Sequence, residues 1–168
     1  MDIQIFQYNE SHLVEIRIIL NEYLTFIAKE LTKQPWNFNL DVENEINFTM
    51  NNLDKFALPY GRLLLVEVDN EIAGTISLRK IREDAGEIKR MYIKPKFRGK
   101  KLGNLLIEEV INISEKNDFS KLYLDTAHFM SSAISLYKKY GFKETTSYPE
   151  SVIPKDLLNT MIFMMKEL

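Results

Sequence analysis

Apolar residues recur along the chain with two different spacings. Alternation of apolar and polar residues over residues 2–8 predicts a strand. From Leu13 to Leu31 the spacing changes to steps of three and four, which predicts a long amphipathic helix that Asn9 or Ser11 can cap. The start of the chain therefore predicts a strand followed by a helix.

The same two patterns repeat through the rest of the chain. An Asn-rich stretch from Thr32 to Asn52 predicts one short helix around Val42–Asn52. The further elements expected in chain order are a hairpin of Leu63–Val68 and Glu71–Arg79, a strand over Glu87–Ile93, a helix over Leu102–Lys116, a strand over Lys121–Asp125, a helix over Ala133–Tyr140, and strands over Phe142–Ser147 and Leu157–Met165. Strands connected through helices predict a mixed α/β layer, and no linker or repeat divides residues 1–168, so we expect a single domain.

Composition narrows the possible chemistry. The 168 residues include no Cys and two isolated His, so disulfides, a Cys nucleophile and a His-based metal cluster are not expected. The first residues, MDIQIFQYNE, resemble neither a signal peptide nor a membrane anchor, so we expect a cytoplasmic protein without a membrane partner. The net charge of −2 disfavours a general nucleic-acid binder, which usually carries a strongly basic face.

Residues 94–106, KPKFRGKKLGNLL, place five cations just before a predicted helix start. The N-terminal end of a helix carries partial positive charge, so acidic residues are the usual choice there. Exposed N–H groups, two Gly and several cations in one turn suit a phosphate or diphosphate, although a solvated basic turn explains the same residues. Neither G-x-x-x-x-G-K-[ST] nor G-x-G-x-x-G occurs in the chain, so a P-loop and a dinucleotide fingerprint are not supported.

Two segments carry a family resemblance. KRMYIKPKFRGKKLGNLLIEE, followed by AISLYKKYGFKE, resembles the strand, pyrophosphate loop and later helix of the GNAT superfamily of acetyl-CoA-dependent N-acetyltransferases, over residues 87–145. The loop motif of that family is [Q/R]-x-x-G-x-[G/A], which Arg98 and Gly103 fit, whereas Lys101 stands in place of the first Gly. Ser131 stands where relatives often carry an Asn that contacts the cofactor.

The resemblance implies a fold and a cofactor. The fold would be a mixed, mostly antiparallel sheet of about seven strands flanked by helices and splayed in the middle to admit acetyl-CoA. Acetyl-CoA would pair with one strand through backbone groups and lay its diphosphate on the basic turn. The cofactor-binding residues carried over are Met91, Tyr92, Ile93, Arg98, Gly99, Lys100, Lys101, Leu102, Gly103, Asn104 and Ser131.

The resemblance also implies two catalytic side chains. Tyr137 matches the tyrosine that protonates the departing thiolate, although a buried structural tyrosine has the same sequence pattern. Glu87 matches a base that acts through water, and it can equally face solvent or pair with Lys89. If Glu87 is not the base, Glu22 and Asp125 are the next carboxylates to test, and bulk water is a further option.

The expected function is transfer of an acetyl group from acetyl-CoA to a primary amine of a small molecule or peptide, by direct attack and without metal. Alternatives are a non-catalytic acyl-CoA-binding or regulatory domain of the same fold and, less favoured at a pI near 5.8, a nucleic-acid-binding module. The protein is expected to be a monomer or homodimer.

The acceptor pocket is expected within the least patterned regions, residues 21–60 and 146–158. The stretch PWNF at 35–38 would be either a lid that faces the substrate or an anchor for its loop. We expect His128 to be a surface residue.

Overall fold

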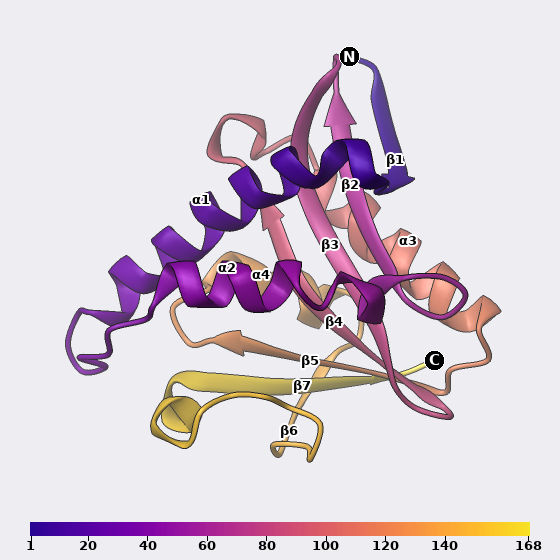
Figure 1. Ribbon diagram of the computed structural model, residues 1–168. Helices are drawn as coiled ribbons and strands as arrows, with labels where there is room; N and C mark the ends of the chain where they lie inside the picture. The colour runs from indigo at the N-terminus through magenta and orange to yellow at the C-terminus, as the bar shows by residue number, and fades with distance from the viewer.

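The computed structural model, which describes residues 1–168, contains one seven-stranded sheet (Figure 1). The strands are β1 (Ile3–Gln7), β2 (Arg62–Val68), β3 (Glu71–Arg82), β4 (Ala85–Ile93), β5 (Lys121–Ala127), β6 (Lys143–Thr145) and β7 (Met161–Glu167). Their order across the sheet is β1-β2-β3-β4-β5-β7-β6, and every neighbouring pair is antiparallel except β4 and β5. The predicted mixed, mostly antiparallel fold class is therefore confirmed.

Helices and short 3₁₀ turns lie on both faces of the sheet. They are α1 (Leu13–Leu31), α2 (Val42–Met50), α3 (Leu102–Lys116) and α4 (Ser131–Lys139), together with the short 3₁₀ turns η1 (Glu10–His12), η2 (Leu53–Phe56), η3 (Pro95–Phe97) and η4 (Lys155–Thr160). In Figure 1, α1 and α2 cross in front of β2, β3 and β4, whereas α3 lies behind these strands. No helix has both the length and the apolarity that a membrane span requires.

Strand β2 contributes to the apolar cores on both faces of the sheet. Leu63 and Leu65 pack in the apolar cluster that contains α1, and Leu64 and Val66 pack in the cluster that contains α3. All four side chains are less than 5% exposed. Because alternate residues of a strand point to opposite faces, the continuous apolar run LLLV at residues 63–66 is the pattern of a strand buried on both sides.

The predicted strand over Leu157–Met165 begins too early. After Pro154 the chain forms the 3₁₀ turn η4, in which the N–H of Leu157 donates to the carbonyl of Pro154 at 2.9 Å. The Thr160 hydroxyl donates to the carbonyl of Leu157 at 2.6 Å. These local bonds occupy groups that a ladder would need, so pairing with β5 starts at Met161.

Other element bounds also differ from the prediction. Strand β3 continues to Arg82, because β4 pairs with it as far as Ala85. Strand β6 is shorter than predicted, since only residues 143–145 pair with β7. Helix α1 begins one turn after its expected cap, because Asn9 caps η1 instead, its side chain accepting from the N–H of Ser11 at 2.9 Å.

Candidate functional site

Strands β4 and β5 separate halfway along their length. They pair in parallel over residues 85–88 and 121–124. Beyond that point β5 continues beside β7 to Ala127, and β4 continues beside β3 to Ile93. The edge of β4 from Lys89 to Ile93 therefore has no strand beside it on the β5 side, and an opening forms in the centre of the sheet.

A β-bulge lies at the start of this free edge. Thr75 of β3 pairs with Tyr92, whereas Ser77 pairs with Lys89, so β4 contains one extra residue. Arg90 has a positive φ of 54°, and the Ser77 hydroxyl donates to the carbonyl of Lys89 at 2.8 Å. The bulge lets two consecutive residues, 89 and 90, face one cavity, while residues 91–93 line another, which Met91 and Ile93 face with their side chains.

The cavity next to residues 91–93 is called here the α3 cavity. It measures about 490 Å³ and is closed by the turn before α3, by the first turns of α4 and by Phe26 of α1. Ten of the eleven residues predicted to bind the cofactor line it: Met91, Tyr92, Ile93, Arg98, Gly99, Lys101, Leu102, Gly103, Asn104 and Ser131. Lys100 does not line it, and its ammonium lies 5.2 Å from the centre of the Phe97 ring.

The turn before α3 presents backbone N–H groups to this cavity. Lys101 is the N-cap residue with φ 60° and ψ 16°, and no side chain caps the helix. Gly99 also has a positive φ, 79°. Lys101 thus adopts the left-handed conformation for which the family motif uses Gly. This conformation costs some strain in any residue that has a side chain. The first turn of α3 can donate to an anion.

Gly103 allows α3 to approach its neighbours closely. A Cβ atom at this position would lie 3.2 Å from Cδ2 of Leu136 and 3.3 Å from Cε of Met91. Both atoms are the ends of flexible side chains that line the α3 cavity. One methyl group is therefore tolerable at position 103, whereas a longer side chain would enter the cavity.

A second cavity, called here the α1–α2 cavity, lies on the other side of the opening. It measures about 430 Å³ and draws its lining from α1, α2, β4, β5, β7 and the segment 152–157. Met130 lines both cavities, so they adjoin where β4 and β5 separate. Much of the lining comes from the two regions in which the sequence analysis expects the acceptor pocket, residues 21–60 and 146–158.

Four charged residues line the α1–α2 cavity, and they form two ion pairs. Lys89 Nζ lies 2.9 Å from Asp125 Oδ2, and both side chains are nearly buried. Arg90 Nη2 lies 3.3 Å from Glu45 Oε2 and is more exposed. Sequence spacing gave no sign of either pair, because each joins residues more than thirty positions apart.

Glu87 lies behind this cavity and lines neither cavity. Its carboxylate is fully buried and bonds to Arg79, accepts from the Tyr148 hydroxyl at 2.6 Å, and lies 3.4 Å from Lys89 Nζ. The Tyr148 hydroxyl is also 3.5 Å from Asp125 Oδ2. Burial, with the nearby carboxylates Asp125 and Glu87, raises the pKa of Tyr148. Glu87 is therefore connected to the cavity by its contacts with Lys89 and Tyr148, both of which also contact Asp125.

Tyr137 lies at the junction of the two cavities without lining either. Its side chain is 5% exposed, and its hydroxyl donates to Met91 Sδ at 3.5 Å. Burial raises the pKa of Tyr137, and the proximity of Tyr23 and Asp125 raises it further. Met91 lines the α3 cavity, whereas Tyr23 and Asp125 line the α1–α2 cavity. Because burial and these neighbours disfavour the charged form, the Tyr137 phenol stays protonated.

The segment that forms one wall of the α1–α2 cavity is tied to β3. Arg82 donates to both carboxylate oxygens of Glu150, at 2.6 and 2.7 Å, and Arg79 donates to its carbonyl at 2.9 Å. The hydrogen bonds from Arg82 lower the pKa of Glu150 to about 2. This clamp fixes the chain just before residues 152–157.

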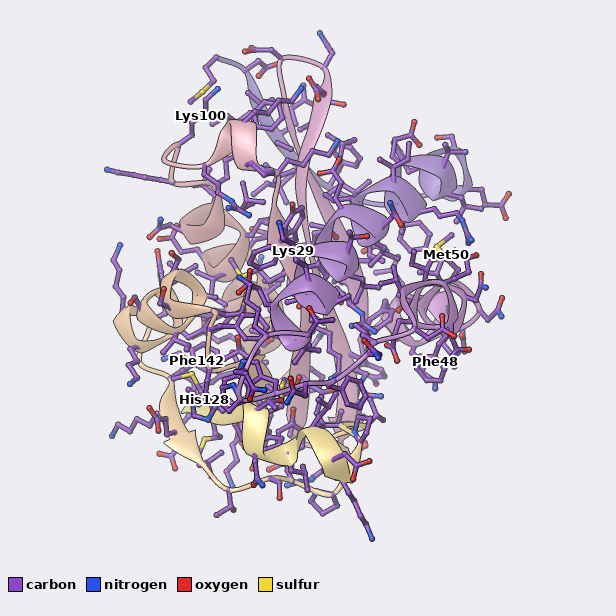
Figure 2. All side chains as sticks on the ribbon, turned by 90° about the vertical axis from the view of Figure 1, so that its left-hand side faces the viewer. Lys29, Phe48, Met50, Lys100, His128 and Phe142 are labelled. Carbon is purple, nitrogen blue, oxygen red and sulfur yellow. The ribbon has the colours of Figure 1, made fainter.

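Trp36 of the PWNF stretch stacks on His128, with ring centres 6.2 Å apart. His128 is exposed, as expected. The contact joins the α1–α2 connection to the residue that follows β5, which favours PWNF as an anchor for its loop. Figure 2 shows His128 beside the C-terminal strands, well away from Lys100. No three His, Asp or Glu side chains converge in a way that could hold a metal ion.

Comparisons with known proteins agree with this architecture. A family model described as the acetyltransferase (GNAT) family matches residues 23–142. An uncharacterized N-acetyltransferase of Schizosaccharomyces pombe is 33% identical over 144 residues, which cover 84% of this chain and 83% of that protein. An IAA acetyltransferase of Azospirillum brasilense is 30% identical over 94 residues, covering 55% and 61% of the two chains.

A solved structure shares the fold over the full chain. The PaiA N-acetyltransferase of Thermoplasma acidophilum, determined in complex with coenzyme A, superposes with a TM-score of 0.78 at 20% identity, and the match covers 100% of both chains. At this level of identity the likeness establishes the fold.

Proposed function

This chain belongs to the GNAT family of acetyltransferases, and from that membership we propose that it transfers the acetyl group of acetyl-CoA to a primary amine. The observation that carries the proposal is the pair of adjoining cavities at the separation of β4 and β5. One cavity is bounded by uncapped N–H groups and cations, and the other is largely apolar. Two substrates can thus enter from different sides and meet beside Tyr137.

The residues of the α3 cavity suit coenzyme A. Uncapped amides of α3, with Arg98 and Lys101 nearby, can hold a diphosphate. Gly99 has no atom within 4 Å of the place where a Cβ would stand, so backbone there is open to a ligand. The free edge of β4 offers backbone donors and acceptors at residues 91–93. Coenzyme A bound to the structural neighbour supports the same ligand here.

Bound acetyl-CoA supplies a thioester whose carbonyl carbon the amine attacks and whose sulfur leaves. The chain must remove a proton from the amine nitrogen and hold one for the sulfur. An alkyl amine with a pKa near 10.4 is mostly protonated at neutral pH. The apolar α1–α2 cavity lowers that pKa by desolvation. Of the two carboxylates that line the cavity, Glu45 and Asp125, we assign the proton to Asp125, because it lies near Tyr137.

Tyr137 would hold the proton for the sulfur. Burial keeps its hydroxyl protonated, and the contact with Met91 Sδ shows that the hydroxyl can lie beside a sulfur atom. Glu87 remains part of the proposed machinery, but as a positioning residue that orients Asp125 through Tyr148 and Lys89. A non-catalytic acyl-CoA-binding domain would require neither side chain.

Coenzyme A is expected to stabilise the protein. At about 100 times Kd, a ligand that binds only the folded state adds about 2.7 kcal/mol, which corresponds to a rise in Tm of about 5–11 °C for a chain of this size. A mixture of primary amines should then release free thiol from acetyl-CoA in the presence of the protein. Stabilisation without thiol release from any amine would favour the non-catalytic alternative, and absence of both would exclude the proposal.

Glu87→Gln is expected to reduce stability and rate together. The change removes one buried charge that faces Arg79 and Lys89, and breaking a buried ion pair in this way costs about 3 kcal/mol, or a fall in Tm of about 6–12 °C. The matched control is Glu83→Gln, whose side chain is 92% exposed and should change Tm by very little.

The pH dependence of kcat/KM separates positioning from base catalysis. Asp125→Asn should lose activity at neutral pH and recover it as the pH approaches the pKa of the amine, because the amine then deprotonates without help. Glu87→Gln should lose activity by a factor that does not change with pH. If Glu87→Gln recovers instead and Asp125→Asn does not, Glu87 itself is the base.

A further inference from the structure

The lining of the α1–α2 cavity is mainly apolar on both sides. From the helices come side chains of α1, of α2 and of the connection between them: Leu24, Ile27, Leu31, Leu40 and Phe48. The opposite wall is formed by Val152, Ile153, Pro154, Leu157 and Met161. A volume of about 430 Å³ lies at the low end of the usual range for small-molecule sites, so the cavity suits a small organic body.

Each charged side chain that lines the cavity has a partner of opposite charge. Lys89 pairs with Asp125, and Arg90 pairs with Glu45. A carboxylate on the acceptor would need an unpaired cation to balance its burial, and a second ammonium would need an unpaired carboxylate. The cavity can therefore accommodate one amine, which loses its proton to react, and disfavours any further charge.

Apolar side chains also mark the mouth of the cavity. Phe48 of α2 is 49% exposed and Val152 of the opposite wall is 56% exposed, and both line the cavity. Phe48 stands on the outer side of the molecule in Figure 2. Exposed apolar residues on both sides of a cavity are expected where an apolar ligand covers them. The body of the acceptor should thus extend to the mouth.

We propose that the acceptor is a hydrophobic monoamine, a primary amine carried by an uncharged aryl-alkyl or branched alkyl body. The inference rests on the proposed function and names its substrate class. The neutral body replaces water along the apolar walls, and the desolvated amine approaches the junction near Tyr137 in the uncharged form that attacks the thioester. The new bond joins the amine nitrogen to the acetyl carbon, the carbon–sulfur bond breaks, the nitrogen's proton passes to Asp125 and the sulfur receives a proton from Tyr137. Asp125 then releases its proton and Tyr137 regains one by exchange with solvent, so the net change is one proton lost by the nitrogen and one gained by the sulfur.

The test compares matched pairs of amines by release of free thiol from acetyl-CoA. 3-Methylbutylamine is set against leucine, 2-phenylethylamine against phenylalanine, and pentylamine against 1,5-diaminopentane, so that each pair differs by one charged group. We expect kcat/KM for the monoamine to exceed that of its charged partner by at least tenfold. In the series from ethylamine to pentylamine, each added methylene should raise kcat/KM about fourfold. This factor corresponds to the free energy of about 0.8 kcal/mol gained when one methylene is transferred out of water.

Three outcomes are distinguishable. Equal or better turnover of the amino acids, of the diamine or of a peptide with a free N-terminus would overturn the substrate class while leaving acetyl transfer intact. Absence of thiol release with every amine, together with no stabilisation by coenzyme A, would overturn the proposed function, and this inference would fall with it. Stabilisation by coenzyme A without turnover of any monoamine in the panel would also overturn the substrate class.

A substitution at Phe48 tests whether the preference for hydrophobic monoamines arises in the α1–α2 cavity. Phe48→Ala is expected to lower kcat/KM for 2-phenylethylamine by at least fivefold while leaving that for ethylamine within a factor of two, since the shorter amine does not reach the mouth. The matched control is Ile18→Ala, a residue of α1 that is also 49% exposed but lines neither cavity. If both variants change the two amines alike, Phe48 does not contact the acceptor and the proposed extension to the mouth is wrong.

Discussion

Tyr137→Phe is expected to lower kcat by about 100-fold or more while leaving affinity for acetyl-CoA almost unchanged, because loss of a general acid commonly costs 10²–10⁴ in rate. The substitution removes one oxygen atom and keeps the ring, which packs against Phe142 with ring centres 5.8 Å apart. The hydroxyl's hydrogen-bonding partner is the weak acceptor Met91 Sδ, so no strong buried partner is left unsatisfied. The fold should therefore survive the change.

Single-turnover kinetics on a good acceptor measure this effect free of product release. The stabilisation by coenzyme A, measured on the same variant, reports whether the α3 cavity is intact. Tyr60→Phe is the matched control, since Tyr60 is 45% exposed and lines neither cavity. Turnover of the Tyr137 variant at the parent rate, where chemistry limits, would make Tyr137 a structural residue.

Gly103→Glu is expected to abolish stabilisation by coenzyme A. The added side chain would meet Leu136 and Met91 and extend into the α3 cavity, and its negative charge would oppose a diphosphate at the same helix end. At a ligand concentration that raises the Tm of the parent by several degrees, the variant should show no shift. Its own Tm without ligand shows whether the fold is retained.

Gly103→Ala tests whether the loss of glycine alone, without a long or charged side chain, affects the stabilisation by coenzyme A. Its Cβ would contact flexible side-chain ends at 3.2 and 3.3 Å, which can move by a few tenths of an ångström. Within a helix, Ala is also favoured over Gly by about 1 kcal/mol. The Ala variant should therefore keep a clear ligand-induced shift. Equal shifts for the Glu variant and the parent would place the diphosphate elsewhere.

Most of the residues that the family resemblance assigned to cofactor binding line the α3 cavity, because they are nearly contiguous in the chain. Residues 91–104 form one strand end, one turn and one helix start, so local pattern and family motif describe most of the lining. The departure at Lys101 was also local, and the backbone accommodates it in a left-handed conformation. Lys100 was included by position in the motif, and its contact with Phe97 was not visible from spacing.

The α1–α2 cavity could be predicted by region but not by residue. Its lining combines two N-terminal helices with the end of β5 and the segment 152–157, which meet only after the sheet has formed. The partners of Glu87 illustrate the same limit. A strand Glu can face solvent or the core, and its burial depends on Arg79 and on Tyr148, which is 61 residues away. Apolar runs such as residues 157–165 also give no sign of where a 3₁₀ turn ends and a strand starts.

The bulge at Arg90 makes the length of β4 as important as its composition. In a regular strand, a change of length by one residue reverses the face of every side chain beyond it, whereas a bulge absorbs one extra residue and keeps the faces on both sides of it. The extra residue of β4 stands between the residues that line the α1–α2 cavity and those that line the α3 cavity. Deletion of residue 90 would remove the bulge and restore regular pairing with β3, so two consecutive residues could no longer face the α1–α2 cavity, whereas substitutions at residue 90 leave the length of the strand unchanged. Changes of length in the connections around residues 32–41 and 151–154, which pair with no strand, leave the pairing of β4 unchanged.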